Sequence, residues 1–216
     1  MMQKIRQSMG KLGDNQGFTL VEMALVLIII GIIIGAIVKG KDLVRSAEQK
    51  KIYSKFVNEW RMAYLNFYDR TGKILGDTFD GTNPGQDGEA DTAGGDNSAP
   101  DAFAELEEST DAANYRGLTD VGLTVPSSNT SNSWVYNYVD NEGTGHQVTI
   151  AFEYDGTNHY NYMQITNLPA ELAMPLDTMI DGSADGTDGD FQNGDGTSDW
   201  DTDPTAEETA RWKMQF

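Results

Sequence analysis

The strongest constraint on the fold of this chain is an uncharged apolar run near its N-terminus, from Met23 to Val38. As a helix, this run is about 24 Å long, and counting from Phe18 it reaches about 31 Å, close to the ~30 Å hydrocarbon core of a bilayer. Glu22 lies inside the longer segment, near one end. A carboxylate in hydrocarbon costs on the order of 3 kcal/mol, so something must compensate for Glu22.

Three ordinary explanations of the run leave Glu22 without a role. A cleaved secretory signal would have a basic start and an apolar core, but GAIVKGKD is a poor small-x-small cleavage site. A buried core helix would need a polar face, which the run lacks. A plain membrane anchor would explain the length of the run, but it would assign no role to the Glu22 carboxylate.

The charge of the chain is unevenly distributed. It has 34 acidic and 15 basic residues, a formal net charge of −19, and 28 of the acidic residues lie from Asp77 to Glu208, a stretch whose one basic residue is Arg116. An acidic body without a basic patch argues against nucleic acid as a partner and suits solubility outside the cell, or divalent cations. The chain has no cysteine, which excludes disulfides, thiolate metal sites and cysteine nucleophiles.

The segment KLGDNQGFTLVEMALVLIIIGIIIGAI resembles the N-terminus of type IV prepilins and type II secretion pseudopilins. The resemblance implies that a prepilin peptidase cleaves between Gly17 and Phe18 on the cytoplasmic side, and that Phe18 becomes the N-methylated first residue. It also implies that Glu22 neutralises the Phe18 ammonium of a neighbouring subunit during assembly. Gly31 falls where the family usually has a glycine that loosens the helix, whereas Lys39 stands in place of the family's common proline.

The chemistry of the segment agrees with this assembly role for Glu22. A charge in a low-dielectric medium is tolerated when it has a partner, and the only candidate cation within residues 18–38 is a new α-amino group. Phe18 and Glu22 lie one turn apart on the same helix, so the Phe18 amine of the same chain is poorly placed to pair with Glu22. The amine of a neighbouring subunit, displaced along a fibre, is better placed. Gly31 and Gly35 form a small-xxx-small pattern that permits close helix packing.

The basic residues on either side of the span conflict with the expected topology. Three precede it and six follow it, so the positive-inside rule alone would place the C-terminal side in the cytoplasm. The peptidase site requires a cytoplasmic leader, and we therefore expect the later group to meet acidic surface on adjacent subunits. Its members are Lys39, Lys41, Arg45, Lys50, Lys51 and Lys55.

Beyond Lys41 the helical periodicity becomes amphipathic and predicts a helix that ends near Thr71, with Gly72 as its cap. Its apolar stripe consists of Leu43, Ala47, Tyr53, Phe56, Val57, Trp60, Tyr64, Phe67 and Tyr68. Alternating residues then predict antiparallel strands over 134–138, 148–154 and 160–165, and a last strand at RWKMQF. A short helix at AFAELEEST and a helical turn at LPAELAMPLDTMIDG complete the prediction.

These patterns predict an α+β, pilin-like fold with a long N-terminal helix packed on an antiparallel sheet. The expected divisions are a removed leader at 1–17, a transmembrane and assembly helix at 18–40, and an amphipathic helix at 41–72. A variable acidic region at 73–132 and a sheet region at 133–216 follow.

The loop at 179–203 is dense in aspartate and contains no basic residue. Its sequence Asp181-x-Ser183-x-Asp185-Gly186 matches the opening of an EF-hand calcium loop, but Gln192 replaces the bidentate glutamate at position twelve. We therefore weigh a looser Ca²⁺ site against a solvated acidic loop. The candidate ligands are Asp181, Ser183, Asp185, Asp188 and Asp190.

The sequence shows no catalytic motif, and we expect the two histidines, His146 and His159, to be surface or strand-edge residues, so we expect no enzyme. We expect a subunit of a pilus or pseudopilus, in adhesion, motility or protein secretion, anchored in the inner membrane with its head in the periplasm and then part of a fibre. Expected partners are other pilin-like subunits, prepilin peptidase, an inner-membrane assembly platform and lipid. The alternative is a membrane-tethered, calcium-dependent binding domain that does not polymerise.

Overall fold

The computed structural model describes residues 17–77, 88–90, 103, 106–108, 117–194 and 196–214. The chain divides into two compact units, Met1–Ser46 and Ala47–Phe216. The expected leader, apart from Gly17, lies outside the described residues, as do parts of the expected acidic region and of the short helix expected at AFAELEEST.

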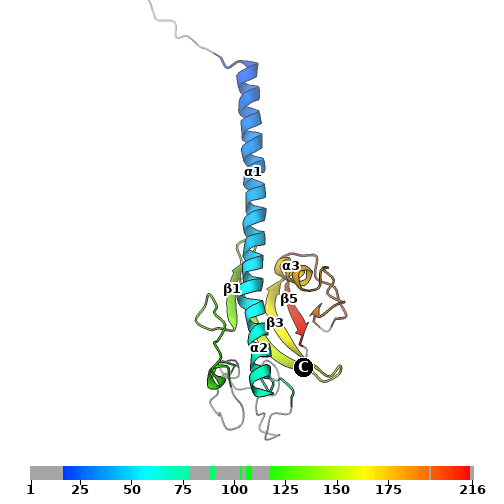
Figure 1. Ribbon diagram of the computed structural model, residues 1–216. Coiled ribbons are helices and arrows are strands. Elements are labelled where there is room, and N and C mark those ends of the chain that lie inside the picture. The colour runs from blue at the N-terminus through cyan, green and yellow to red at the C-terminus, as the bar shows by residue number, and fades with distance from the viewer. Residues whose placement is uncertain are drawn as a thin grey trace, which may run out of the picture. The chain divides into compact units, whose positions relative to one another are not determined.

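The N-terminal part of the chain is a long helix, as predicted. Helix α1 (Leu20–Ile52) continues through a π-helical turn, η1 (Tyr53–Val57), into α2 (Asn58–Thr71), as Figure 1 shows. The backbone remains α-helical through Gly31 and through Lys39. Helix α2 ends where the sequence predicted, because Gly72 adopts a left-handed φ of 70° and donates its N–H to Tyr68 O at 2.7 Å.

The π-helical turn was not predicted from the sequence, and it follows from the spacing of the buried side chains. Ile52, Phe56, Trp60 and Tyr64 recur every four residues and are fully buried. A four-residue step drifts by about 40° around an α-helix, since each residue turns by about 100°. A wider π turn reduces that drift, so η1 keeps this stripe on the side of the helix that packs against the sheet.

The sheet of the C-terminal unit has five antiparallel strands in the order β1-β2-β3-β5-β4 (Figure 1). The strands are β1 (Val135–Val139), β2 (Gly145–Asp155), β3 (Tyr160–Pro169), β4 (Phe191–Asn193) and β5 (Glu207–Lys213). Helix α3 (Ala170–Ile180) follows β3 directly and has eleven residues. A register shift between Ile165 and Leu168 coincides with Asn167, whose φ is 54°.

Three sequence predictions about this unit need correction. Strand β4 lies inside the segment that was predicted as loop, and it pairs Phe191 with Trp212 of β5. Strand β5 begins at Glu207, four residues before the predicted start, because its first residues pair with the end of β3 beyond the register shift. The predicted helical turn is the three-turn helix α3, which accommodates Pro175.

The core forms where helix and sheet meet, and its centre is aromatic. The ring centroids of Tyr64 and Phe152 are 4.9 Å apart, those of Phe56 and Tyr136 are 5.2 Å apart, and Trp60 lies 6.3 Å from Phe152. The sheet therefore covers the predicted aromatic stripe. The first two members of that stripe were wrongly included, since Leu43 and Ala47 are exposed.

Candidate functional site

The first turn of α1 holds Glu22 in a reciprocal pair of hydrogen bonds with Thr19. Glu22 Oε2 accepts from the Thr19 backbone N–H at 2.8 Å and from the Thr19 hydroxyl at 2.7 Å. In return, the Glu22 backbone N–H donates to Thr19 Oγ1 at 3.2 Å. This is a capping box, which satisfies two of the N–H groups that a helix leaves unpaired at its start.

The capping box is a role of Glu22 that the sequence analysis missed, although Thr-x-x-Glu before an apolar run is its known signature. Both partner groups on Thr19 are uncharged, so they orient the carboxylate without balancing its charge. The geometry therefore leaves two separable roles for Glu22, which are to cap α1 and to present a negative charge near the Phe18 end of the helix.

Around this carboxylate the helix is apolar and exposed. Phe18 is 79% exposed and Leu20 is 90% exposed, and every residue from 17 to 44 is classed as exposed. The helical run Leu20–Thr71 contains a segment that is long and apolar enough to cross a membrane. A Cβ added at Gly31 or Gly35 would meet nothing within 4 Å, so both glycines leave backbone open to the approach of another helix.

The aspartates of the 179–203 loop serve mainly as acceptors for the loop's own backbone. Asp181 Oδ2 accepts from Phe191 N at 2.8 Å, and Asp185 Oδ1 accepts from Thr187 N at 3.0 Å and Thr187 Oγ1 at 2.7 Å. These are the side-chain turns that aspartate commonly forms. The hydrogen bonds from Thr187 lower the pKa of Asp185.

The other predicted ligands lie on the surface of the same loop. Ser183, Asp188 and Asp190 are exposed, and of these Asp190 takes part in the fold through its backbone carbonyl, which accepts from Lys213 N at 2.8 Å. Gly186 is buried, and a Cβ there would lie 2.9 Å from Asn193 Cβ. The glycine is therefore required by close packing as much as by a turn.

A carboxylate that the sequence analysis did not single out lies at the centre of this loop. Asp177, in α3, is fully buried, and its Oδ2 accepts from Trp200 Nε1 at 2.7 Å and from Asp185 N at 2.8 Å. Its Oδ1 has no hydrogen-bond partner among the described residues. Burial, aided by the nearby charges of Asp181 and Asp185, raises the pKa of Asp177 despite these two bonds.

The fit of this loop to a cation follows from these contacts. Within the described part of the chain, no three carboxylate or histidine side chains converge as metal ligands. The amide bonds use Oδ2 of Asp181 and Oδ1 of Asp185, and since a carboxylate has about four acceptor sites, these bonds do not by themselves prevent either residue from binding Ca²⁺. The predicted calcium site thus remains a prediction, and the loop is held by its own hydrogen bonds.

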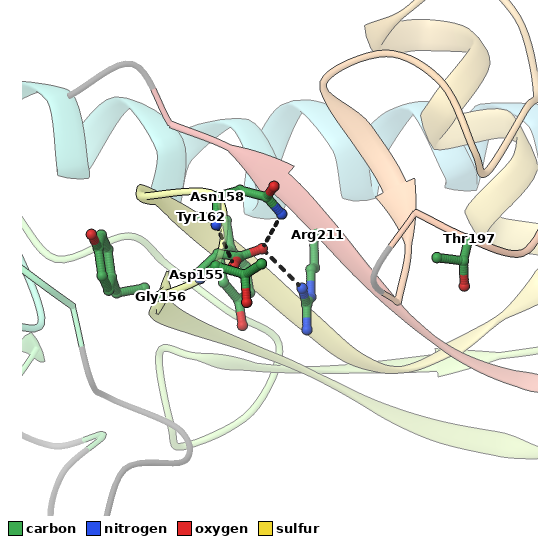
Figure 2. Close-up of a pocket in the computed structure, with 8 residues that line it drawn as sticks. Asp155, Gly156, Asn158, Tyr162, Thr197 and Arg211 are labelled. Carbon is green, nitrogen blue, oxygen red and sulfur yellow. Dashed lines mark hydrogen bonds and ion pairs between the residues drawn. The ribbon is translucent and has the colours of Figure 1, made fainter.

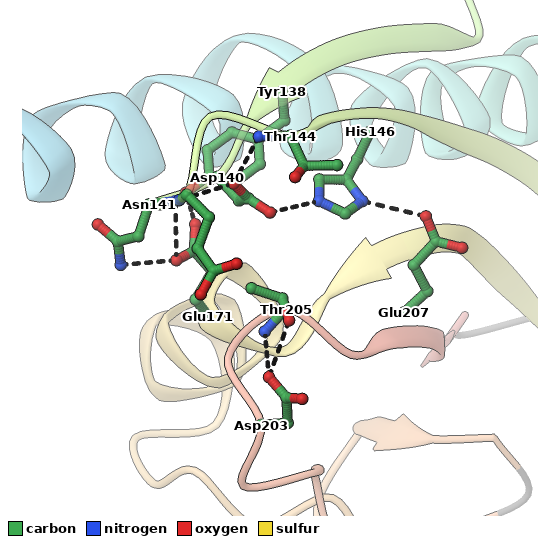
Figure 3. A network of polar contacts seen from close by, with 10 residues as sticks. Tyr138, Asp140, Asn141, Thr144, His146, Glu171, Asp203, Thr205 and Glu207 are labelled. Carbon is green, nitrogen blue, oxygen red and sulfur yellow. Dashed lines mark hydrogen bonds and ion pairs between the residues drawn. The ribbon is translucent and has the colours of Figure 1, made fainter.

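His146 differs from the sequence prediction, because it is 4% exposed and lies between two carboxylates (Figure 3). Its Nε2 lies 3.0 Å from Asp140 Oδ2, and its Nδ1 lies 3.1 Å from Glu207 Oε1. Asp140 also caps the turn between β1 and β2, because its Oδ1 accepts from Glu142 N and Thr144 N. The histidine thereby ties that turn to the start of β5.

The protonation of His146 follows from its surroundings. Burial by itself lowers the pKa of the imidazole, but the hydrogen bonds and charges of Asp140 and Glu207 outweigh it, and the net pKa is raised. Two carboxylate acceptors require an N–H on both ring nitrogens, which is the imidazolium form. His146 is therefore a structural cation in this unit.

His159 is exposed, as predicted, in the turn between β2 and β3, where its φ is 57°. Its Nδ1 lies 2.8 Å from the hydroxyl of Tyr154. Both histidines are thus held by contacts within the fold.

Comparison with known proteins matches one segment of the chain. Residues 13–38 match the prokaryotic N-terminal methylation motif, and they include Gly17, Phe18, Glu22 and the apolar first half of α1. No curated protein and no solved structure matches the chain. With this motif at the head of a long apolar helix, and with a helix-on-sheet unit after it, the chain carries the signature of the type IV pilins and pseudopilins.

Proposed function

We propose that this chain is a structural subunit of a type IV pilus or pseudopilus. In this proposal, prepilin peptidase cleaves between Gly17 and Phe18, Phe18 is N-methylated, and the subunits polymerise through α1. The exposed head remains outside the inner membrane. The methylation motif at 13–38 supports this pilin-like, structural role.

The observation that carries the proposal is a single carboxylate in an otherwise apolar, exposed helix. From Phe18 to Val38 Glu22 is the only charged side chain, and its Thr19 partners are neutral. Exposed apolar surface on this scale marks a membrane or protein contact. Inside such a contact the charge of Glu22 needs a cation, and the Phe18 ammonium of the next subunit supplies it without adding a further side chain.

The capping box makes Glu22→Ala an ambiguous test, because it removes the cap and the charge together. Glu22→Gln keeps a side chain that can close a capping box and removes only the charge. Thr19→Ala is the matched control, because it removes the hydroxyl partner and leaves the charge. The three variants therefore separate the two roles.

The experiment compares fibres from cells that produce the wild-type chain, Glu22→Gln or Thr19→Ala as the sole source of this subunit. The proposal expects Glu22→Gln to lose at least tenfold in fibre incorporation while it accumulates in the membrane, and Thr19→Ala to incorporate nearly normally. Normal incorporation of Glu22→Gln would show that Glu22 serves only as a cap, and would remove the counter-ion proposal.

The charge pattern beyond the span also fits a fibre of this chain. Lys41, Lys50 and Lys51 are exposed on α1. Lys39 and Lys55 form local, exposed ion pairs with Asp42 at 3.7 Å and with Glu59 at 3.8 Å. Such pairs contribute little to stability, so these cations are available to a stronger partner. We propose that they meet the acidic surface of adjacent subunits.

Calcium binding by the 179–203 loop is a separate proposal, and it belongs to the alternative of a tethered binding domain that does not polymerise. Its support is Oδ1 of buried Asp177, which has no hydrogen-bond partner within the described part of the chain and lies close to Asp181 and Asp185. A divalent cation would offset the charge that burial disfavours at this position.

A further inference from the structure

The C-terminal unit contains a polar cavity that plays no part in assembly through α1. It has a volume of about 460 Å³ and lies between the turn that joins β2 to β3 and the loop that follows β4. Strands β3 and β5 contribute Tyr162 and Arg211 to its lining, and Thr197 comes from the loop. Figure 2 shows Asp155, Asn158 and Arg211 close together and Thr197 apart from them.

Asp155 holds this cavity in a fixed shape. Its Oδ1 accepts from Thr157 N at 2.9 Å and from Asn158 N at 3.0 Å, and its Oδ2 accepts from Asn158 Nδ2 at 3.0 Å. Nη1 of Arg211 lies 3.6 Å from Oδ2 of Asp155. The guanidinium carbon of Arg211 lies 4.7 Å from the ring centroid of Tyr162. The polar groups of the cavity are thus positioned before any ligand arrives, which reduces the entropic cost of binding.

The charges in the cavity indicate what kind of ligand it suits. Among the described residues that line it, Asp155 and Arg211 are the charged ones, and they pair with each other. The hydrogen bonds from Asn158 and Thr157, together with the charge of Arg211, lower the pKa of Asp155, so the pair is ionised at neutral pH and has no net charge. An anion would approach a chain of net charge −19 and find its one cation already paired.

The remaining groups suit a neutral polyhydroxyl ring. Thr157 and Asn158 are exposed lining residues, and a hydroxyl and an amide can each both donate and accept hydrogen bonds. Tyr154, whose hydroxyl lies 2.8 Å from His159 Nδ1, is a further lining residue, and aromatic rings can bury the apolar face of a ligand. A volume of about 460 Å³ falls within the range of about 300–1,000 Å³ that is typical of small-molecule sites.

We propose that this cavity, between Asp155–Asn158, Arg211 and Thr197, binds a neutral hexopyranose unit of a saccharide. The ring would lie against Tyr154, while Thr157 and Asn158 exchange hydrogen bonds with its hydroxyls. The site lies wholly in the C-terminal unit, so this proposal can be tested independently of fibre assembly.

The test is saturation-transfer NMR on the full chain in micelles of a detergent without a sugar headgroup, so that the detergent cannot occupy the cavity. The probes are the methyl glycosides of glucose, galactose, mannose and N-acetylglucosamine, with methyl glucuronide as the anionic comparison. We expect transfer to at least one neutral glycoside, strongest at the protons of one ring face, and weaker transfer to the glucuronide.

Two variants locate the binding, and a third controls for the loss of a hydrogen bond in a turn. Thr157→Val and Asn158→Ala should each weaken binding of the responding glycoside at least fivefold. Asn141→Ala removes an equivalent bond in the other hairpin, where Asn141 Nδ2 donates to Glu171 Oε2 at 2.7 Å, and should leave binding unchanged. Absence of transfer to every neutral probe, binding that both pocket variants retain, or tighter binding of the glucuronide would each overturn the proposal.

Discussion

His146 and Asp140 form a buried ion pair, in which Nε2 of His146 lies 3.0 Å from Oδ2 of Asp140. The other ring nitrogen of His146, Nδ1, lies 3.1 Å from Oε1 of Glu207. Asp140 and Glu207 are the two charged groups that raise the pKa of the imidazole. Through Glu207 this pair connects the turn between β1 and β2 to the start of β5, so its protonation should influence the stability of the C-terminal unit.

The first prediction concerns pH. The pKa of His146 is raised above its ordinary value of 6.5, so the stabilisation is fully present below pH 6.5 and is lost as pH rises through the pKa of the folded state. The melting temperature should therefore fall with rising pH above 6.5. The measurement is thermal unfolding of the full chain in detergent from pH 5 to pH 9, followed by circular dichroism of the sheet.

Two variants decide whether His146 is the cause of that fall. His146→Gln should be less stable at pH 6 and should lack this part of the pH dependence. His159→Asn is the control, because it changes an exposed histidine at a left-handed position that asparagine tolerates, and it should keep the wild-type slope. An unchanged slope in His146→Gln would refute the assignment.

A second prediction compares two tyrosine hydroxyls. The hydroxyl of Tyr64 is buried and has no partner among the described residues, whereas that of Tyr138 donates to Glu171 Oε1 at 2.8 Å. Tyr64→Phe removes an unsatisfied polar group and should increase the free energy of unfolding by about 1 kcal/mol. Tyr138→Phe should decrease it by a similar amount, and denaturant titration measures both. A loss of stability in Tyr64→Phe would mean that its hydroxyl has a partner.

A third prediction tests the calcium proposal. Binding at the 179–203 loop predicts heat on calorimetric titration and a higher melting temperature at millimolar Ca²⁺. Asp181→Asn should lose both effects, while Asp42→Asn, on α1, should keep them. The absence of heat and of a thermal shift in the wild-type chain would remove the proposal.

A fourth prediction concerns salt. If the basic residues after the span contact acidic surface on adjacent subunits, raising the ionic strength from about 0.1 M to about 1 M shortens the screening length from about 10 Å to about 3 Å. Subunit release from purified fibres should then increase. Lys50→Gln together with Lys51→Gln should reduce this salt dependence, and release that does not change with salt would contradict the contact.

Much of the fold could be predicted because its signals are local. The uncharged run predicted α1, and Gly72 predicted the end of α2. The alternation of residues predicted the central parts of β1, β2 and β3. Strand β4 has only three residues and lies among aspartates and glycines, so no alternation marked it. The π-helical turn depends on which face of the helix packs against the sheet. The sequence of the helix alone does not indicate that face.

The candidate functional residues divide in the same way. Gly17, Phe18 and Glu22 belong to a contiguous motif and were predicted from it, while the capping contact of Glu22 was missed although Thr19 signalled it. The environments of His146 and Asp177 depend on residues far away in the chain, such as Glu207 and Trp200. No local pattern indicates that either side chain is buried.

The most direct test of the account is the intact mass of the subunit in purified fibres. The account predicts a chain that begins at Phe18 with one methyl group on its amino nitrogen, because that amine is the proposed partner of Glu22. A fibre subunit that retains residues 1–17, or purified fibres that do not contain this chain, would contradict it.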